Sequence, residues 1–432
     1  MEHPIKKILA DRRSGIPCGI PSYCSANMLV LEAAMLRAKK MKKPVLIEAT
    51  ANQVNQFGGY TGMKPADYYR TVMDLARKIG VPEEYLILAG DHLGPLTWQN
   101  EPEEEAMAKS IELVKLFVSA GFKKIHLDTS MKLADDPEGA LSTETVARRG
   151  VELYKVCMQA YEELKKEKPN AMRPVFVIGS EVPIPGGAQE EEDALAVTKP
   201  EAFRDTVETY KRMFAEYGVP EAWEDVIAVV VQPGVEFGDD QVFLYKRKNA
   251  ALLCECLKDY PTIGYEGHST DYQSEKCLRQ MVEDGIYILK VGPALTYGLR
   301  EALFALAMME KEVVPEELHS NFIEVLEEVM QKDPSNWKKH YHGDERACHL
   351  ARKYSFSDRA RYYIGKPEVQ KAQAIMFENL RNYELPMNML HQYMPSQYMK
   401  VRNGRLDKDP RNLAIDGIYT FMREYEYACY RK

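Results

Sequence analysis

Seven apolar segments of the chain each end in a short cluster of polar residues drawn from the same few types. A run of valine, isoleucine and leucine is typical of a parallel strand buried on both faces, and polar groups are costly to bury without partners. Because the carboxyl ends of parallel strands meet at one side of a sheet, we expect these clusters to converge in space. In chain order the clustered residues are Glu48, Asp91, His92, His126, Asp128, Glu181, Gln232, Glu236, Glu266, His268, Asp271 and Lys290.

Strand-like and helix-like patterns alternate through residues 1–314. Pro65, Pro102 and Pro200 lie where helices should begin, whereas Gly80 and Gly121 follow the last apolar residue of a helical pattern. Eight strands alternating with eight helices predict an α/β protein with a (β/α)8 TIM barrel. The alternative, a doubly wound open sheet, normally carries phosphate-binding glycines after its first strand, and the sequence has none there. The predicted strands begin near residues 17, 45, 86, 124, 175, 226, 262 and 287.

The character of the sequence changes after the eighth helix, which is predicted to run from about Tyr297 to Val313. Residues 315–432 contain no strand-like run and show helical patterns at 316–331, 367–383 and 411–430. We therefore expect a barrel at 1–314 and a helical C-terminal extension at 315–432. The least regular part of the extension, residues 338–365, can reach over the barrel mouth as a lid.

Composition and charge narrow the classes of function. A net charge of −8 and an isoelectric point near 5.8 give no basic field, which argues against nucleic acid as a partner. No segment approaches the roughly 20 apolar residues of a membrane span, and the first residues contain no apolar run long enough for a signal peptide. The eight cysteines are scattered without a CxxC pair, which is typical of reduced thiols. We expect a cytoplasmic protein that binds no membrane.

Three of the clustered side chains form a candidate metal site. His92, Glu181 and His268 follow the third, fifth and seventh predicted strands and supply nitrogen, oxygen and nitrogen ligands. This set suits a divalent cation, zinc first and manganese or cobalt as alternatives, with positions left open for a substrate. Gln232 and Asp128 are candidate further ligands. The alternative for each histidine is an ordinary hydrogen-bonded structural role.

Several charged residues exceed what one metal ion needs, and they are candidates for proton transfer. Asp91 directly precedes the first histidine ligand, so it is placed beside the substrate as a proton donor and acceptor. Asp128 and Glu48 are further catalytic candidates. Glu266 is expected either to act itself or to orient a histidine. Lys290 is either a Schiff-base nucleophile in a metal-free reaction or, beside a metal, a group that stabilises anionic oxygens.

The loops after the last two predicted strands, HSTDY and VGPALTYG, lie where TIM barrels usually bind phosphate. Ser269, Thr270 and backbone N–H groups near Gly292 can donate to phosphate oxygens. The alternative is that Ser269, Thr270 or Asp271 simply caps the following helix. These four positions are the phosphate-binding candidates.

Two further groups of residues are candidates for substrate binding. Arg359, together with Arg361, can clamp a phosphate from the extension, although a solvated or structural arginine is the alternative. The loop after the second strand carries amide side chains that suit sugar hydroxyls, with turn formation as the alternative. These amides are Asn52, Gln53, Asn55 and Gln56.

Long strings of the sequence carry a family resemblance over nearly the whole chain. They are IEATANQVNQFGGYTGM, GDHLGP, KIHLDTSM, SEVPIPGG, VVQPGVEF, GHSTDYQ, LKVGPALTYGLREALFALA and SFSDRARYY. Together they resemble the family of tagatose-bisphosphate aldolase accessory, non-catalytic subunits. That family also looks like the source of sugar-phosphate 4-epimerases that interconvert fructose 6-phosphate and tagatose 6-phosphate.

The same family is similar in turn to class II, metal-dependent aldolases. This resemblance implies that Asp91 is the acid and base and that His92 and His268 are metal ligands. Those aldolases have another histidine ligand after the sixth strand, where this chain has Gln232. Glu181 is then expected to bind the metal more directly.

These observations lead us to expect a metal-dependent 4-epimerase of a ketohexose 6-phosphate, working by retro-aldol and aldol steps. The alternative is a non-catalytic subunit that forms a hetero-complex with a class II tagatose-1,6-bisphosphate aldolase. A homo-oligomer is compatible with either role. A stand-alone bisphosphate aldolase would need a second phosphate site, and the sequence reveals none.

Overall fold

The computed structural model describes residues 2–180, 182 and 197–430. Within these residues, eight parallel strands close into a barrel in the order β1-β10-β9-β6-β5-β4-β3-β2, which confirms the predicted TIM barrel. The wall consists of the apolar runs that the sequence shows, and its residues are buried except Cys24 at the end of β1, which is partly buried. The barrel strands are β1 (Ile20–Cys24), β2 (Val45–Thr50), β3 (Leu86–Leu93), β4 (Lys124–Leu127), β5 (Val175–Ile178), β6 (Val226–Val231), β9 (Gly264–Gly267) and β10 (Ile286–Val291).

Helices follow the strands and begin and end at local sequence signals. Asn27 caps α2 by accepting from the N–H groups of Leu29 and Val30. Gly80 and Gly121 end α3 and α4 in the left-handed region, with φ of 74° and 102°. The helices around the barrel are α2 (Met28–Met41), α3 (Pro65–Ile79), α4 (Glu103–Ala120), α5 (Thr143–Glu167), α6 (Pro200–Glu216), α7 (Arg247–Cys256), α8 (Glu275–Glu283) and α9 (Pro293–Val313).

Two elements of the barrel were not predicted. Helix α1 (Pro4–Arg13) precedes the first strand, and its Ile5 and Leu9 pack with apolar side chains of the barrel strands. A short hairpin of β7 (Glu236–Phe237) and β8 (Val242–Phe243) lies between β6 and α7. Helix α9 begins at Pro293, one turn before the predicted start, because a proline is well suited to the first helical position.

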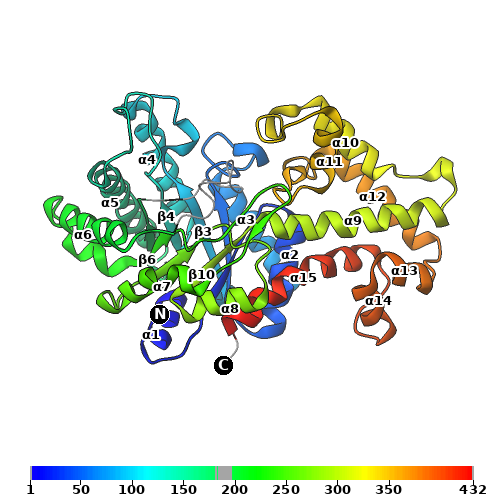
Figure 1. Cartoon of the computed structure of the whole chain (residues 1–432), viewed down its shortest axis with the longest axis horizontal. Coiled ribbons are helices and arrows are strands. Elements are labelled where there is room, and N and C mark those ends of the chain that lie inside the picture. Colours follow the sequence, from blue (N-terminus) through cyan, green and yellow to red (C-terminus); the bar gives the residue numbers. More distant parts are fainter. Residues whose placement is uncertain (1, 181, 183–196, 431–432) are drawn as a thin grey trace.

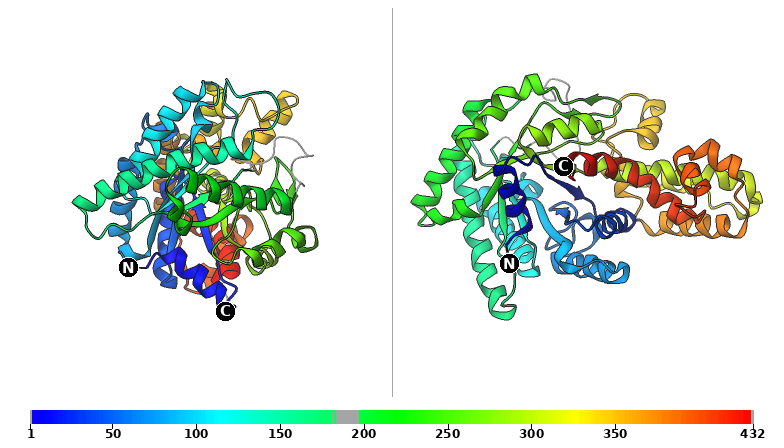
Figure 2. Two further views of the ribbon diagram at one scale, coloured as in Figure 1. Left: turned by 90° about the vertical axis from the view of Figure 1, so that its left-hand side faces the viewer. Right: turned by 90° about the horizontal axis from the view of Figure 1, so that it is seen from below.

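The chain beyond α9 is helical, as expected. Helices α10, α11 and α12 lie beside α9, α13 and α14 lie near its outer end, and α15 returns alongside α9 to the barrel (Figures 1 and 2). Helix α15 packs against α9, α8 and α2. Among the described residues, none of the helices has the length and apolar character to cross a membrane. The bounds are α10 (Phe322–Lys332), α11 (Glu345–Tyr354), α12 (Pro367–Asn382), α13 (Met387–Tyr393), α14 (Pro395–Arg402) and α15 (Pro410–Tyr430).

Candidate active site

The end of β3 is irregular, and this irregularity brings two adjacent side chains into the barrel mouth. The pairing of β3 with β4 shifts register between Gly90 and Leu93, at the position of Asp91 and His92. His92 adopts a φ of 47°, which is uncommon for a residue other than glycine and is found at functional sites. A regular strand would send two adjacent side chains to opposite faces. The shift therefore allows Asp91 and His92 to reach the same site.

Glycine at position 94 allows the ends of β3 and β4 to approach closely. A Cβ atom added at Gly94 would stand 1.8 Å from the carbonyl oxygen of Asp128. No side chain fits at that separation, so the sequence GDHLGP requires its second glycine. This contact fixes the ends of the two strands that carry most of the site.

Four buried residues bring possible ligand atoms together at the mouth. Atoms of Asp91, His92, His126 and His268 all lie within 4.8 Å of one another. The ring centroids are 5.0 Å apart for His92 and His126, 4.9 Å for His92 and His268, and 5.3 Å for His126 and His268. Imidazole nitrogens with a carboxylate oxygen form a donor set that suits a divalent cation.

Carboxylates fix the tautomers of two of these histidines. His92 Nδ1 lies 2.7 Å from Asp128 Oδ2, and His268 Nε2 lies 2.9 Å from Glu266 Oε1. Burial favours the neutral acid, but the hydrogen bond and charge of His92 outweigh it and lower the pKa of Asp128, while Lys124 and His268 lower the pKa of Glu266. Both ionised carboxylates can only accept, so each histidine donates from the nitrogen named. The other ring nitrogen keeps its lone pair, as in protein metal sites.

His126 completes the set, and its second nitrogen has no partner among the described residues. His126 Nδ1 lies 2.9 Å from Asp91 Oδ1, and the backbone N–H of His92 points at the same nitrogen at 3.2 Å. The shorter contact, to an ionised carboxylate, is the stronger and makes Nδ1 the donor. His126 Nε2 is then a buried acceptor without a hydrogen bond in the described part of the chain. Such an orphaned atom is costly unless a ligand meets it, so these residues fit a bound cation.

Lysines and carboxylates alternate beneath and beside the histidines. Lys124 and Glu48 are fully buried and form an ion pair, and Lys124 Nζ also lies 2.7 Å from Glu266. Lys290 forms an ion pair with Asp91 and lies 3.6 Å from Glu48. These contacts link charged residues of β2, β3, β4, β9 and β10 in one network.

The network sets the charge states of Asp91 and Lys290. Burial opposes ionisation of Asp91, but the charges of His92 and Lys290 outweigh it and hold the pKa of Asp91 well below its usual value. Burial likewise lowers the pKa of Lys290, but Asp91 and Glu48 more than compensate and raise it. A protonated Lys290 is a hydrogen-bond donor and not the neutral amine that a Schiff base requires.

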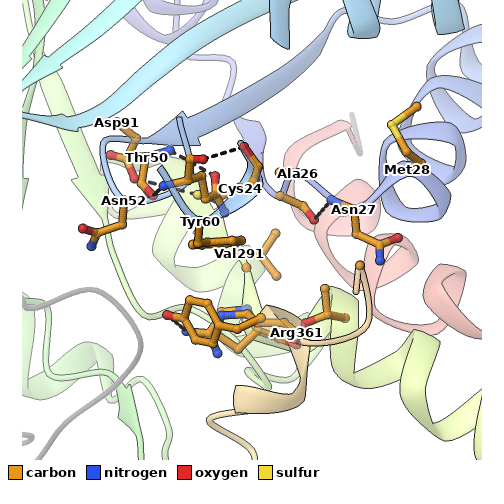
Figure 3. A pocket seen from close by; sticks show the side chains of 18 of the residues that line it. Cys24, Ala26, Asn27, Met28, Thr50, Asn52, Tyr60, Asp91, Val291 and Arg361 are labelled. Carbon is orange, nitrogen blue, oxygen red and sulfur yellow. Dashed lines mark hydrogen bonds between the residues drawn. The ribbon is translucent and has the colours of Figure 1, made fainter. Parts of the chain in front are cut away.

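A cavity of about 470 Å³ opens above the cluster (Figure 3). The barrel contributes its strand ends and following loops, and the extension contributes a second wall. From the barrel the lining includes Cys24, Asn27, Thr50, Asn52, Gln53, Tyr60, Asp91, His92, Phe237, His268, Ser269, Asp271, Lys290 and Gly292. From the extension it includes Arg361, Tyr362, Gly365, Lys366, Gln370 and Gln373.

The expected sugar-binding amides divide into two groups. Asn52 and Gln53 line the cavity. Asn55 lies outside the lining, and its side chain accepts from the N–H groups of Phe57 and Gly59 and so closes the loop. The turn-forming alternative therefore describes Asn55.

The expected phosphate-binding residues divide similarly. Ser269 and Gly292 line the cavity, and Ser269 has a left-handed φ of 50°. Asp271 also lines it, but one of its oxygens accepts from the backbone N–H groups of Gly292 and Ala294 at the start of α9. Thr270 lies outside the lining, fully buried, and donates to the carbonyl oxygen of Lys290.

Two other expected residues differ from their assigned positions. Gln232 turns into its own loop, where Oε1 accepts from the N–H groups of Gly234 and Val235. Arg359 lies outside the lining and donates to the carbonyl oxygen of Asn336. Glu181 lies outside the described residues.

The sequence named His126 but gave it no role, although it shares a strand face with Asp128. That shared face was the signal, because residues two apart on a strand point the same way. Tyr60 and Tyr362 carried no such signal, since they come from a loop and from the extension. Their rings meet edge to face at 4.8 Å across the cavity lining.

A family model and a solved structure each match nearly the whole chain. A family model for the D-tagatose-1,6-bisphosphate aldolase subunit GatZ/KbaZ-like family matches residues 5–430. The crystal structure of a probable tagatose 6 phosphate kinase from Sinorhizobium meliloti 1021 is 42% identical, with a TM-score of 0.87, and the match covers 95% of this chain and 100% of that one.

Two solved aldolases are more distant. The YdjI aldolase from Escherichia coli K12 is 13% identical with a TM-score of 0.43, over 84% of this chain and 96% of that one. A fructose-bisphosphate aldolase from Campylobacter jejuni is 15% identical with a TM-score of 0.43, over 88% and 95%. Similarity at this level supports no functional inference.

Proposed function

Because the chain belongs to the D-tagatose-1,6-bisphosphate aldolase subunit GatZ/KbaZ-like family, we propose that it is a sugar-phosphate enzyme of aldolase type. Its reaction is the inversion of C4 of a ketohexose 6-phosphate, which interconverts fructose 6-phosphate and tagatose 6-phosphate. The observation that carries this proposal is the convergence of three histidines and Asp91 within 4.8 Å beside a cavity. A purely structural subunit has no need of such a set.

The three histidines are the proposed ligands of a divalent cation, zinc first and manganese or cobalt as alternatives. Asp128 orients His92, Glu266 orients His268, and Asp91 orients His126. When bound, the cation supplies Lewis acidity that favours breaking of the bond between C3 and C4. The buried histidines keep their geometry without it because each has a carboxylate partner.

Asp91 carries the proton in this proposal. It is ionised and lines the cavity, so its Oδ2 can accept the proton of the C4 hydroxyl as the C3–C4 bond breaks. The bonding electron pair stays with C3, and C4 becomes an aldehyde. The aldehyde turns its other face to C3, the bond forms again, and Asp91 returns the proton to the new C4 oxygen. Protonated Lys290, beside Asp91, donates a hydrogen bond to that oxygen while it is negative.

Both fragments must stay in the cavity between cleavage and recombination. Tyr362 and Gln373 of the extension line the cavity. The extension segment that carries Arg361 lies on the opposite side of the cavity from the strand end at Asp91 (Figure 3). We propose that this part of the extension acts as a lid that retains the aldehyde and excludes water.

The second candidate function is the one that the family description names, a subunit of a tagatose-bisphosphate aldolase. In that role the chain would stabilise a catalytic partner and would need no turnover of its own. The buried histidine cluster favours the enzyme, and the family name favours the subunit.

One experiment separates the two candidates. The purified protein is treated with a chelator, loaded with Zn²⁺, Mn²⁺ or Co²⁺, and incubated alone with fructose 6-phosphate. Appearance of tagatose 6-phosphate, lost in His268→Ala and retained in the surface variant Arg77→Ala, supports the epimerase. Absence of product with every cation, together with stabilisation of an added class II aldolase, supports the subunit and overturns the epimerase.

A further inference from the structure

The wall of the cavity contains an arginine without a carboxylate partner. Arg361 lies in a short 3-10 helix of the extension, residues Arg359–Tyr362, and lies across the cavity from Asp91 with Tyr60 between them (Figure 3). Its guanidinium donates to the carbonyl oxygens of Ser357 and Asp358 and to the hydroxyl of Tyr362, the last at 2.9 Å. In the described part of the chain, no carboxylate oxygen lies within ion-pair distance of it.

Two fully buried arginines of this chain are paired with acids. Arg149 contacts Glu103 and Asp136, and Arg300 contacts Asp358. A buried charge is retained at low cost only when an opposite charge meets it. Arg359, which is buried, and Arg361, which is partly buried, have no carboxylate partner in the described part of the chain, and of these two only Arg361 lines the cavity.

The nearest acid of the same segment is not available to Arg361. Asp358 accepts from Arg300 at 2.6 Å through one oxygen and from Thr296 at 2.6 Å through the other. Its own backbone carbonyl already holds one donor of Arg361. The guanidinium therefore has unmet charge that faces the cavity.

Two neighbouring polar side chains of the cavity wall can also contact a ligand. Gln373 lines the same wall, is 8% exposed, and its Oε1 has no hydrogen-bond partner among the described residues. Lys366, whose Nζ lies 4.0 Å from Asp333 in an exposed ion pair, adds a second positive charge to the lining. Burial alone would raise the pKa of Tyr362, but the charges of Arg361 and Arg359 outweigh it and lower that pKa.

The loop where a phosphate was expected is already occupied by an acid. Asp271 takes the N–H groups of Gly292 and Ala294 at 3.0 Å and 2.8 Å, so the start of α9 has fewer donors left for a ligand. Burial raises the pKa of Asp271 to about 6, and the charge of Arg361 partly opposes this rise. An anion in the cavity would therefore be repelled by the Asp271 carboxylate at the start of α9 and attracted by Arg361 of the extension.

We propose that Arg361 binds the anionic group at the C6 end of the sugar, with Lys366 and Gln373 beside it. The sugar rests on the proposed function, whereas the anion site does not. The planar fork of a guanidinium matches either a phosphate ester or a carboxylate. The histidine cluster and Asp91 at the barrel mouth then face the carbonyl end of the substrate. Arg361 in the extension makes the cavity prefer charged sugars to neutral ones. A cavity of about 470 Å³ is within the usual range for a small ligand.

The test measures binding instead of turnover. Glucitol 6-phosphate has no carbonyl group and cannot undergo retro-aldol cleavage, so calorimetry with this compound reports the anion site alone. We expect the wild-type protein to bind it at least about tenfold more tightly than glucitol, with or without chelator, since hydrogen bonds to charged groups contribute on this scale. Arg361→Met should remove that preference and Arg361→Lys should keep part of it. Arg77→Ala, which removes an exposed cation, should change nothing.

Gluconate provides the second arm, because it offers a carboxylate in place of the phosphate. Arg361-dependent binding of either anion supports the inference, and the tighter one identifies the natural group. The inference is overturned if Arg361→Met, folded by circular dichroism, binds glucitol 6-phosphate as the wild type does. It is also overturned if wild-type protein prefers neither anion over glucitol. A protein that prefers the anion but has no epimerase activity would reject only the proposed reaction.

Discussion

Asp128 Oδ2 accepts a hydrogen bond of 2.7 Å from His92 Nδ1, and Asp128 Oδ1 accepts one of 2.7 Å from the hydroxyl of Ser130. Both oxygens of Asp91 are also engaged, by His126 and Lys290, but Asp91 lines the cavity whereas Asp128 lies outside the lining. The two carboxylates lie on neighbouring strands and are both ionised, yet only one is placed to meet a substrate. Position, and not charge state, separates their roles.

Asp91→Asn and Asp128→Asn should therefore fail in different ways. Asp91→Asn should lower turnover by about 10²- to 10⁴-fold at any cation concentration, because an amide cannot accept the proton. Asp128→Asn should lower cation affinity by about 10- to 100-fold, and excess cation should restore most of the turnover. Turnover of fructose 6-phosphate as a function of Zn²⁺ concentration measures both effects. Rescue of Asp91→Asn by added cation would contradict the proton-carrying role.

His126→Ala tests the ligand set independently of turnover. Loss of a residue that only orients a metal ligand can weaken cation binding by up to about 100-fold. Removing His126, a proposed direct ligand, should weaken it by at least as much. Cobalt absorption spectra and calorimetry on chelator-treated protein measure this loss. His391→Ala on α13 is the matched control, since His391 is exposed and packs edge to face on Tyr398 at 4.6 Å. Equal affinity in His126→Ala and wild type would remove His126 from the set.

The barrel could be predicted from the sequence because its strands are continuous apolar runs and its helices carry proline and glycine signals at their ends. The convergence of Asp91, His92 and His268 followed from the same reasoning, since strand ends of a barrel meet at one mouth. The sequence also predicted Asp128 at this mouth, but it does not show that Ser130 and His92 use both of its oxygens.

Other features depend on contacts that no local pattern encodes. The sequence could not distinguish Arg359 from Arg361, because which of the two faces the cavity depends on how the segment around them turns. Helix α1 was missed because its short pattern resembles a disordered start of a chain. Gln232 was a plausible ligand by position, and only the loop geometry shows its side chain accepting from Gly234 and Val235.

The buried network beneath the histidines should contribute strongly to stability through one residue. Lys124 is fully buried between Glu48 and Glu266, so Lys124→Met would remove the nearest counter-charge of two buried carboxylates. We expect the free energy of unfolding to fall by about 3–5 kcal/mol, measured by urea denaturation. Adding Glu48→Gln should recover part of the loss. Lys166→Met, at an exposed ion pair with Glu163, should change it by less than about 1 kcal/mol.

The amino end of α1 should make stability depend on pH. His3 is buried, accepts from the N–H of Ile5 at 3.2 Å and lies 3.0 Å from the carbonyl oxygen of Lys123. Burial lowers the pKa of His3 from 6.5 to about 4, so between these values the unfolded chain binds the extra proton. The contribution of His3 should therefore be complete above pH 6.5 and should be lost as the pH falls towards 4.

His3→Gln isolates this effect, because glutamine can retain hydrogen bonds but does not titrate in this range. The difference in unfolding free energy between wild type and His3→Gln should shrink as the pH falls from 7 to 4, by up to about 3 kcal/mol for a pKa difference of this size. Urea denaturation at half-unit pH intervals measures it. A difference that stays constant with pH would mean that His3 titrates alike in the folded and unfolded chain.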